Sequence, residues 1–198
     1  MNEDRLDFPA TSRNRDALVD VLSGRLPKEG RLLEVASGSG QHVAWFATRW
    51  PGVTFVPSDP DPRHRASIAA WTDELPNVEA PIDLDVLRSP WAIDLVDFVF
   101  CANMIHISPF ACTEALIANA ATVLSPAGRL WLYGPFVQAD VETAPSNLAF
   151  DASLRERNPA WGIRHLDEVT ALSDQAGLTR TDVVAMPANN LFVAFERR

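Results

Sequence analysis

The chain has very little lysine and cysteine. Lys28 is the only lysine among 198 residues, so arginine carries almost all of the positive charge. Cys101 and Cys112 are the only cysteines, too few and too oddly spaced for a disulfide framework or a zinc site. We therefore expect no metal site.

Long apolar runs and basic clusters are also absent from the sequence. No stretch approaches the roughly 18 apolar residues that span a bilayer. Residues 1–10 are acidic and polar, without the basic and apolar regions of a signal peptide. A net charge of −9 disfavours binding to a nucleic-acid backbone. We expect a cytoplasmic protein that binds neither membrane nor nucleic acid, with a homodimer left open.

Apolar periodicity predicts strands and helices in alternation. With 47% hydrophobic residues, a chain of this length can bury one core, so we expect one domain over residues 1–198. The expected strands are residues 31–36, 53–56, 78–84, 95–101, 129–133, 181–185 and 191–195. The expected helices are residues 12–22, with Ser12 as cap, 41–50, 62–72, 109–124 and 167–176. This order predicts an α/β fold with a doubly wound, mostly parallel sheet that ends in an antiparallel hairpin.

One connection is longer than the others. Residues 134–164 form a polar, proline-containing excursion between the fifth strand and the last helix. Connections of this length are often functional, so we expect a lid or a substrate-binding loop here.

A small-residue turn follows the first expected strand. Gly38 and Gly40 allow backbone N–H groups to approach a ligand closely. Glu34 is unusual in such a turn, because a carboxylate would repel a pyrophosphate. The turn therefore favours S-adenosylmethionine (SAM) over NAD.

Polar side chains also follow the next three expected strands. Asp59 ends the second strand, where a carboxylate can accept ribose hydroxyls, as it also does in NAD enzymes. Asp85 ends the third strand, and Asn103 follows the fourth. Ligands bind outside the carboxyl ends of parallel strands, and an acidic rim there suits the sulfonium and ammonium groups of SAM.

These motifs resemble those of class I SAM-dependent methyltransferases. In this chain Ala36 stands where that class usually has its first glycine, a departure that tightens the space near the methionine moiety. A closer resemblance, over nearly the whole chain, is to the methyltransferase-like protein 26 family, long labelled a domain of unknown function. It is carried by segments that include residues 37–42 (SGSGQH), 57–59 (PSD), 102–107 (ANMIHI), 132–136 (LYGPF) and 186–190 (MPANN).

The resemblance implies a Rossmann-like sheet of seven strands with an antiparallel last strand. It also implies that Glu34 and the glycines approach the methionine part of SAM, Asp59 the ribose, and Asp85 with Val86 the adenine. The candidate cofactor-binding residues are Glu34, Ala36, Gly38, Gly40, His42, Asp59, Asp85, Val86, Asn103, Asn14 and Arg15. Asp85 could instead be a cap or turn residue, and the Arg13–Arg15 segment a solvated basic face.

Methyl transfer requires positioning, exclusion of water and sometimes a base. Asn103 and His106 lie just past the fourth strand and are the candidate catalytic residues. A histidine there could take a proton from the acceptor; alternatively it caps the following helix or fills a polar core position.

The candidate substrate-binding residues lie in the excursion and at its two ends. They are Tyr133, Asn147, Trp161, Arg164, Asn189 and Asn190. Arg164 could bind a carboxylate or phosphate with its guanidinium fork, and Trp161 could stack on a substrate. The sequence thus predicts a SAM-dependent methyltransferase (EC 2.1.1.-) acting on a small molecule, with the acceptor atom undetermined. The alternatives are a noncatalytic SAM-binding protein and an NAD(P)-dependent Rossmann oxidoreductase, although the latter's Tyr-x-x-x-Lys pair is absent.

Overall fold

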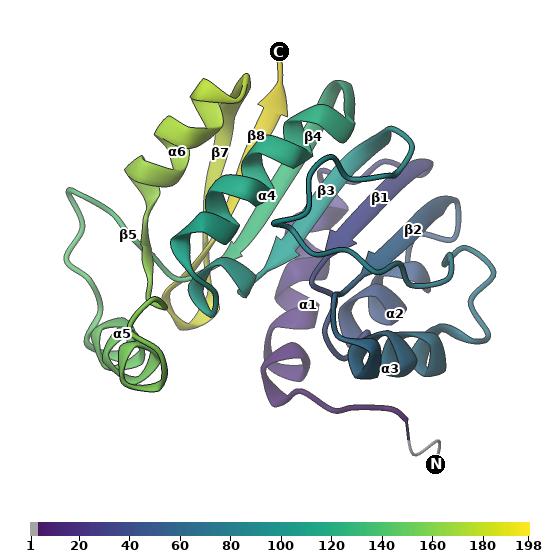
Figure 1. Cartoon of the computed structure of the whole chain (residues 1–198), viewed down its shortest axis with the longest axis horizontal. Helices are drawn as coiled ribbons and strands as arrows, with labels where there is room; N and C mark the ends of the chain where they lie inside the picture. The colour runs from purple at the N-terminus through teal and green to yellow at the C-terminus, as the bar shows by residue number, and fades with distance from the viewer. Residues whose placement is uncertain (1–3) are drawn as a thin grey trace. The chain divides into compact units, whose positions relative to one another are not determined.

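The computed structural model describes residues 4–198, which fall into two compact units. The first unit comprises Met1–Asp85 and Val96–Cys101, and the second Val86–Leu95 and Ala102–Arg198. We expected one domain over residues 1–198; each unit has its own strands and helices (Figure 1).

The first unit is built on parallel strands. Strand β1 (Gly30–Val35) lies between β2 (Val53–Ser58) and β3 (Val96–Ala102) and is parallel to both. The last four residues of β1 are all buried, as expected for a parallel strand covered on both faces. Near the start of β3, the Asp97 carboxylate accepts a hydrogen bond from the backbone N–H of Arg31 at 2.9 Å, which accounts for a charge in an apolar strand.

Three helices accompany these strands: α1 (Pro9–Ser23), α2 (Gln41–Ala47) and α3 (Pro62–Thr72). Helix α3 has the predicted bounds, because Asp61 accepts a hydrogen bond from the N–H of Arg63 and Pro62 occupies the first turn. The predicted start of α1 at Ser12 is wrong. Pro9 begins the helix instead, since its fixed φ suits the first helical position.

The predicted strand over residues 78–84 is also wrong. This segment makes only two isolated bridges to β2, Phe55 with Val78 and Ser58 with Ile82. Pro81 lies between the two bridges and has no N–H to donate, which prevents a continuous ladder. Over residues 4–198 the main sheet therefore has six strands, three in each unit, where seven were expected.

In the second unit, β8 (Asn190–Arg197) lies between β4 (Leu124–Gly134) and β7 (Leu178–Met186) and is antiparallel to both. This confirms the predicted hairpin and the reversed last strand. Helices α4 (Phe110–Val123) and α6 (Leu166–Gln175) pack against each other beside these strands (Figure 1). Strand β8 runs against both of its neighbours, and β1, β2 and β3 are parallel, so the α/β class with a mostly parallel sheet is confirmed.

The excursion over residues 134–164 has structure of its own. It contains β5 (Phe136–Val137) and helix α5 (Pro145–Arg157) and reaches β6 (Arg164–His165), which is parallel to β5. Two short 3₁₀ helices complete the unit, η1 (Met104–His106) and η2 (Pro187–Asn189).

Lys28 is exposed in the connection between α1 and the amino end of β1. Among residues 4–198, no helix is long and apolar enough to cross a membrane. Over the same range, no group of three or more histidine, cysteine or acidic side chains could hold a metal ion.

The glycine after β1 is required for steric reasons. Gly40 has a φ of +87°, and an added Cβ would lie 2.6 Å from the Cα of Ile68 on α3. We expect Gly40→Ala to lower the free energy of unfolding by about 3 kcal/mol, through backbone strain and this clash. Chemical denaturation measures the loss.

Two other glycines separate the causes. Gly177 has a φ of +82° with open space around it, so Gly177→Ala reports strain alone, about 1 kcal/mol. Gly24 has neither constraint and should tolerate alanine. Equal losses in Gly40→Ala and Gly177→Ala would show that the contact with Ile68 is unimportant.

Candidate functional site

The turn between β1 and α2 has three residues in the left-handed region. Ala36, Gly38 and Gly40 have φ values of 56°, 58° and 87°. Ala36, which stands in place of the usual glycine, thus adopts a conformation that glycine takes at lower cost. A Cβ on Gly38 would lie 3.0 Å from the ring of Phe8, so this aromatic residue covers the turn.

Glu34 is buried at the end of β1, with 2% of its surface exposed. Its Oε2 has no hydrogen-bond partner among the described residues. Burial raises the pKa of its carboxyl to about 8, and repulsion from Asp59 adds to the shift, although Ser37 lowers it. At neutral pH this carboxyl group is therefore largely protonated, and one of its own two oxygens lacks a partner.

His42 and Asn14 complete this cluster. The Nε2 of His42 lies 2.7 Å from the Oδ1 of Asn14, and the Nδ1 of His42 lies 3.9 Å from the Oε1 of Glu34. Burial and, to a smaller extent, the charge of Arg15 together lower the pKa of His42 to about 4. A neutral ring donates from Nε2 to the asparagine oxygen, so His42 and Glu34 do not form an ion pair at neutral pH.

Asp59 ends β2 and holds the glycine turn. Its Oδ2 accepts a hydrogen bond from the N–H of Gly38 at 3.0 Å, and its Oδ1 accepts from the N–H of Asp61 at 2.9 Å. His64 lies 3.0 Å from the same Oδ1. A carboxylate offers about four acceptor positions, so this network leaves Asp59 one acceptor position for a further hydroxyl.

Three other cofactor candidates have surroundings of their own. The guanidinium of Arg15 stacks on the ring of Trp45 at 3.8 Å and lines a cavity of about 280 Å³, together with Arg5 and Trp71. Asp85 ends the first of the two segments that make up the first unit. Val86 begins a segment of the second unit, where its carbonyl accepts a hydrogen bond from Asn119.

In the second unit, His106 is fully buried in η1, and neither ring nitrogen has a hydrogen-bond partner of normal geometry among residues 4–198. Burial lowers its pKa to about 3 and the charge of Arg164 acts in the same direction, whereas the nearby backbone of Gly162 raises it. Asn103 precedes η1 in a left-handed conformation, with a φ of 62°. Gly134 is required beside them, because a Cβ there would overlap the Nε2 of His106.

Arg164 holds this turn in place. Its Nε donates to the carbonyl of Ile105 at 2.8 Å, and its Nη2 donates to the carbonyls of Ser108 and Ala160. These contacts commit Nε and Nη2 to the backbone rather than to the substrate carboxylate or phosphate that we had considered.

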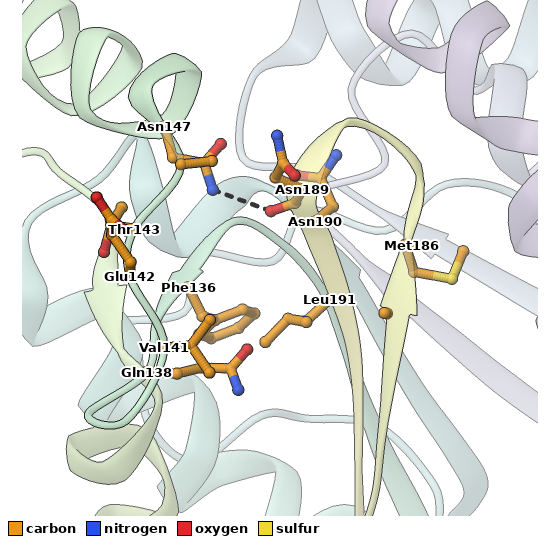
Figure 2. A pocket seen from close by; sticks show the side chains of 12 residues that line it. Phe136, Gln138, Val141, Glu142, Thr143, Asn147, Met186, Asn189, Asn190 and Leu191 are labelled. Atoms are coloured by element: carbon orange, nitrogen blue, oxygen red, sulfur yellow. Dashed lines mark hydrogen bonds between the residues drawn. The ribbon is translucent and has the colours of Figure 1, made fainter.

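A cavity of about 230 Å³ brings together three of the six candidate substrate residues, Asn147, Asn189 and Asn190 (Figure 2). Tyr133 and Trp161 lie outside its lining: Tyr133 is buried in β4, and Arg157 lies over the Trp161 ring at 5.4 Å.

The turn between β7 and β8 borders the cavity and is strained. Ala188 and Asn189 have φ values of 58° and 56°, and such conformations cost non-glycine residues about 1–3 kcal/mol. The buried Asn147 donates its Nδ2 to the carbonyl of Asn189 at 2.9 Å, which holds the turn (Figure 2).

The sequence did not reveal several residues of these sites. Phe8 covers the glycine turn, and Phe136, Val141 and Glu142 line the cavity. Phe136 could have been found as the apolar residue directly after the Gly134–Pro135 break. No local signal identifies the other three, because their positions depend on tertiary contacts.

The raised pKa of Glu34 predicts a pH-dependent stability. Between pH 6.5 and 8 its carboxyl is ionised in the unfolded chain but keeps its proton in the folded protein. The folded state then binds more protons, so stability falls with rising pH, by about 2 kcal/mol over this window. Unfolding by denaturant at both pH values should show the fall in the wild type and its absence in Glu34→Gln.

His42 and His106, whose pKa values lie near 4 and 3, stay neutral in the folded protein, so stability rises as their charge in the unfolded chain is lost through about pH 6.5. This rise extends weakly into the window and is common to the wild type and Glu34→Gln, so the difference between the two proteins isolates Glu34. Glu29→Gln, at an exposed position before the same strand, is the control and should keep the wild-type slope. An unchanged slope in Glu34→Gln would contradict the prediction.

Solved structures share this fold. An O-methyltransferase family protein from Burkholderia thailandensis aligns with a TM-score of 0.80 at 19% identity, covering 95% of this chain and 57% of that chain. Human N-acetylserotonin methyltransferase in complex with SAM aligns with a TM-score of 0.77 at 14% identity, covering 95% of this chain and 52% of that chain. CalO1, a methyltransferase in calicheamicin biosynthesis in its SAH-bound form, aligns with a TM-score of 0.75 at 18% identity, covering 96% of this chain and 55% of that chain. The chain thus spans little more than half the length of these proteins.

A family model matches nearly the whole chain, over residues 6–197. That family is described as a protein of unknown function (DUF938). Because the match includes both units and all of the site residues described above, the chain belongs to the DUF938 family.

Proposed function

We propose that this protein is a SAM-dependent methyltransferase acting on a small-molecule acceptor, related to the methyltransferase-like protein 26 family. The observation that carries this proposal is the buried Glu34 carboxyl, whose Oε2 has no partner beside the glycine turn. The fold of the solved methyltransferases, two of which are described with SAM or SAH, supports it.

The residues of the first unit fit this cofactor. An ammonium group beside the buried Glu34 oxygen would favour the ionised carboxylate, so Glu34 would lose its proton when this cation binds and then pair with it. The remaining acceptor position of Asp59 suits a ribose hydroxyl. Gly38 and Gly40 keep side chains out of the turn, and the carboxylate argues against the pyrophosphate of NAD. We assign Ala36, His42 and Asn14 to the same site and keep Arg15 and Asp85 as further contacts within the first unit. For Val86 and Asn103, in the second unit, a role in SAM binding stays a prediction from the resemblance.

SAM supplies an activated methyl group on its sulfonium when it is bound. The protein must then orient the acceptor and exclude water. His106 is buried and neutral near pH 7, so one of its ring nitrogens can donate a hydrogen bond and the other can accept one. We assign it, with Asn103, to positioning the acceptor. A pKa near 3 makes His106 a weak proton acceptor in this state.

Calorimetry tests the cofactor. We expect SAM and SAH to bind and NAD to give no heat, because Glu34 favours a cationic ligand. Glu34→Gln should weaken SAM binding about tenfold or more, the value of a charge-assisted hydrogen bond.

Glu29→Gln makes the same substitution at the other end of β1 and should bind SAM like the wild type. Binding of NAD without a response to SAM or SAH would refute the proposal.

A second test concerns His106. Transfer of label from methyl-labelled SAM into a small-molecule cell extract should fall about 100-fold in His106→Ala, because the acceptor is no longer held in position. The Kd for SAM should stay within about twofold, since the Glu34 cluster is unchanged. A neutral His106 predicts no break near pH 6.5 in the wild-type rate profile.

His165→Ala, an exposed histidine in β6, is the control and should transfer label normally. A break near pH 6.5 that disappears in His106→Gln would show instead that His106 acts as a base.

A further inference from the structure

The cavity of the second unit is assembled from segments far apart in the sequence. It lies between β5, the loop that follows it, the start of α5 and the turn between β7 and β8. Figure 2 shows Phe136 and Leu191 pointing toward each other, with Val141 close by. These side chains give the cavity an apolar wall, and the asparagines add polar groups at one end.

The protein maintains this cavity at a conformational cost. Its turn contains two left-handed non-glycine residues, Ala188 and Asn189, fixed by the side chain of Asn147. A second bond joins the Nδ2 of Asn189 to the hydroxyl of Ser146 at 3.1 Å. Strain of this kind persists where surrounding structure imposes it and is concentrated at binding sites.

The cavity also lies next to the unpaired histidine. The ring of Phe136 contacts the ring of His106 edge-on, with centroids 5.2 Å apart, and the same Phe136 lines the cavity. The Phe136 side chain therefore borders both the cavity and the imidazole of His106.

The size of the cavity limits its ligand. A cavity of about 150 Å³ holds benzene in another protein, so about 230 Å³ accommodates one ring with a substituent. A nucleotide or a folded peptide segment would not fit wholly within this space.

The charges around the cavity limit its ligand further. Residues 136–147 and 185–191, which supply the entire lining, contain Asp140 and Glu142 but no arginine, lysine or histidine. Glu142 itself lines the cavity. An anionic ligand would meet carboxylates without a compensating cation, whereas an amine would be attracted.

We propose that this cavity binds the methyl acceptor, a molecule of one-ring size that carries an amine or hydroxyl and no anionic group, and that Glu142 sets this preference. That the ligand is the methyl acceptor rests on the proposed function. The binding preference itself does not depend on methyl transfer.

Saturation-transfer NMR on the full chain with SAH present tests the preference, with benzylamine, benzyl alcohol and benzoate as probes. We expect benzylamine and benzyl alcohol to bind and benzoate to bind at least about tenfold more weakly than benzylamine. Glu142→Lys should reverse the order of benzylamine and benzoate, because it reverses the charge at the cavity.

Two further variants locate the effect. Glu156→Lys makes the same charge change on the exposed surface of α5, outside the lining, and should keep the wild-type order. Val141→Trp places a large ring at an exposed lining position and should abolish binding of all three probes without disturbing the core.

Equal binding of benzoate and benzylamine, no binding of any probe, an equal effect of Glu156→Lys, or full binding in Val141→Trp would each overturn the inference. Calorimetry with SAM on the same sample separates the two proposals. Probe binding in the expected order without SAM binding would support the ligand preference of the cavity and refute the proposed methyltransferase function. SAM binding with the wrong probe order would support SAM as the cofactor and refute the ligand preference.

Discussion

The first unit buries a carboxyl group at the end of β1, and neighbouring side chains hold the backbone that carries it. An isolated buried charge is expensive, so Glu34 remains largely protonated at neutral pH. The register of β1 and β2 places Ser58 next to Val35, and its hydroxyl donates to the carbonyl of Glu34 at 2.8 Å. The hydroxyl of Ser37 donates to the same carbonyl at 3.2 Å. The backbone of Glu34 is thus satisfied by neighbours, while its side chain is left with an unpaired oxygen.

The second unit has a similar arrangement around the buried His106. The turn that carries His106 is satisfied through its backbone: Arg164 donates to the carbonyl of Ile105, and the N–H of Gly162 donates to the carbonyl of His106 at 3.0 Å. The imidazole itself has no partner among the described residues. In both units the backbone is fixed and one ionisable side chain is left available, which is the arrangement expected of preorganised binding groups.

Much of the fold could be predicted from local signals. Helix α3 was predicted to the residue because its cap and proline are adjacent in sequence, and the β7–β8 hairpin because a short turn separates two apolar runs. The prediction of a strand over residues 78–84 was wrong because it relied on the apolar residues of the segment, whereas Pro81 interrupts the hydrogen bonding to β2. The role of Arg164 could not be predicted, since its carbonyl partners Ile105 and Ser108 lie 59 and 56 residues away. Glu142 was missed for the same reason, because only tertiary contacts place it at the cavity.

The single lysine makes the protein straightforward to attach or label through a side-chain amine. Lys28 is exposed and lies two residues before β1, whereas the glycine turn follows the far end of that strand. Six residues of strand separate the two ends by roughly 20 Å. An amine-reactive dye or surface linker would therefore modify one side chain only, at a known distance from Glu34, and leave the turn accessible.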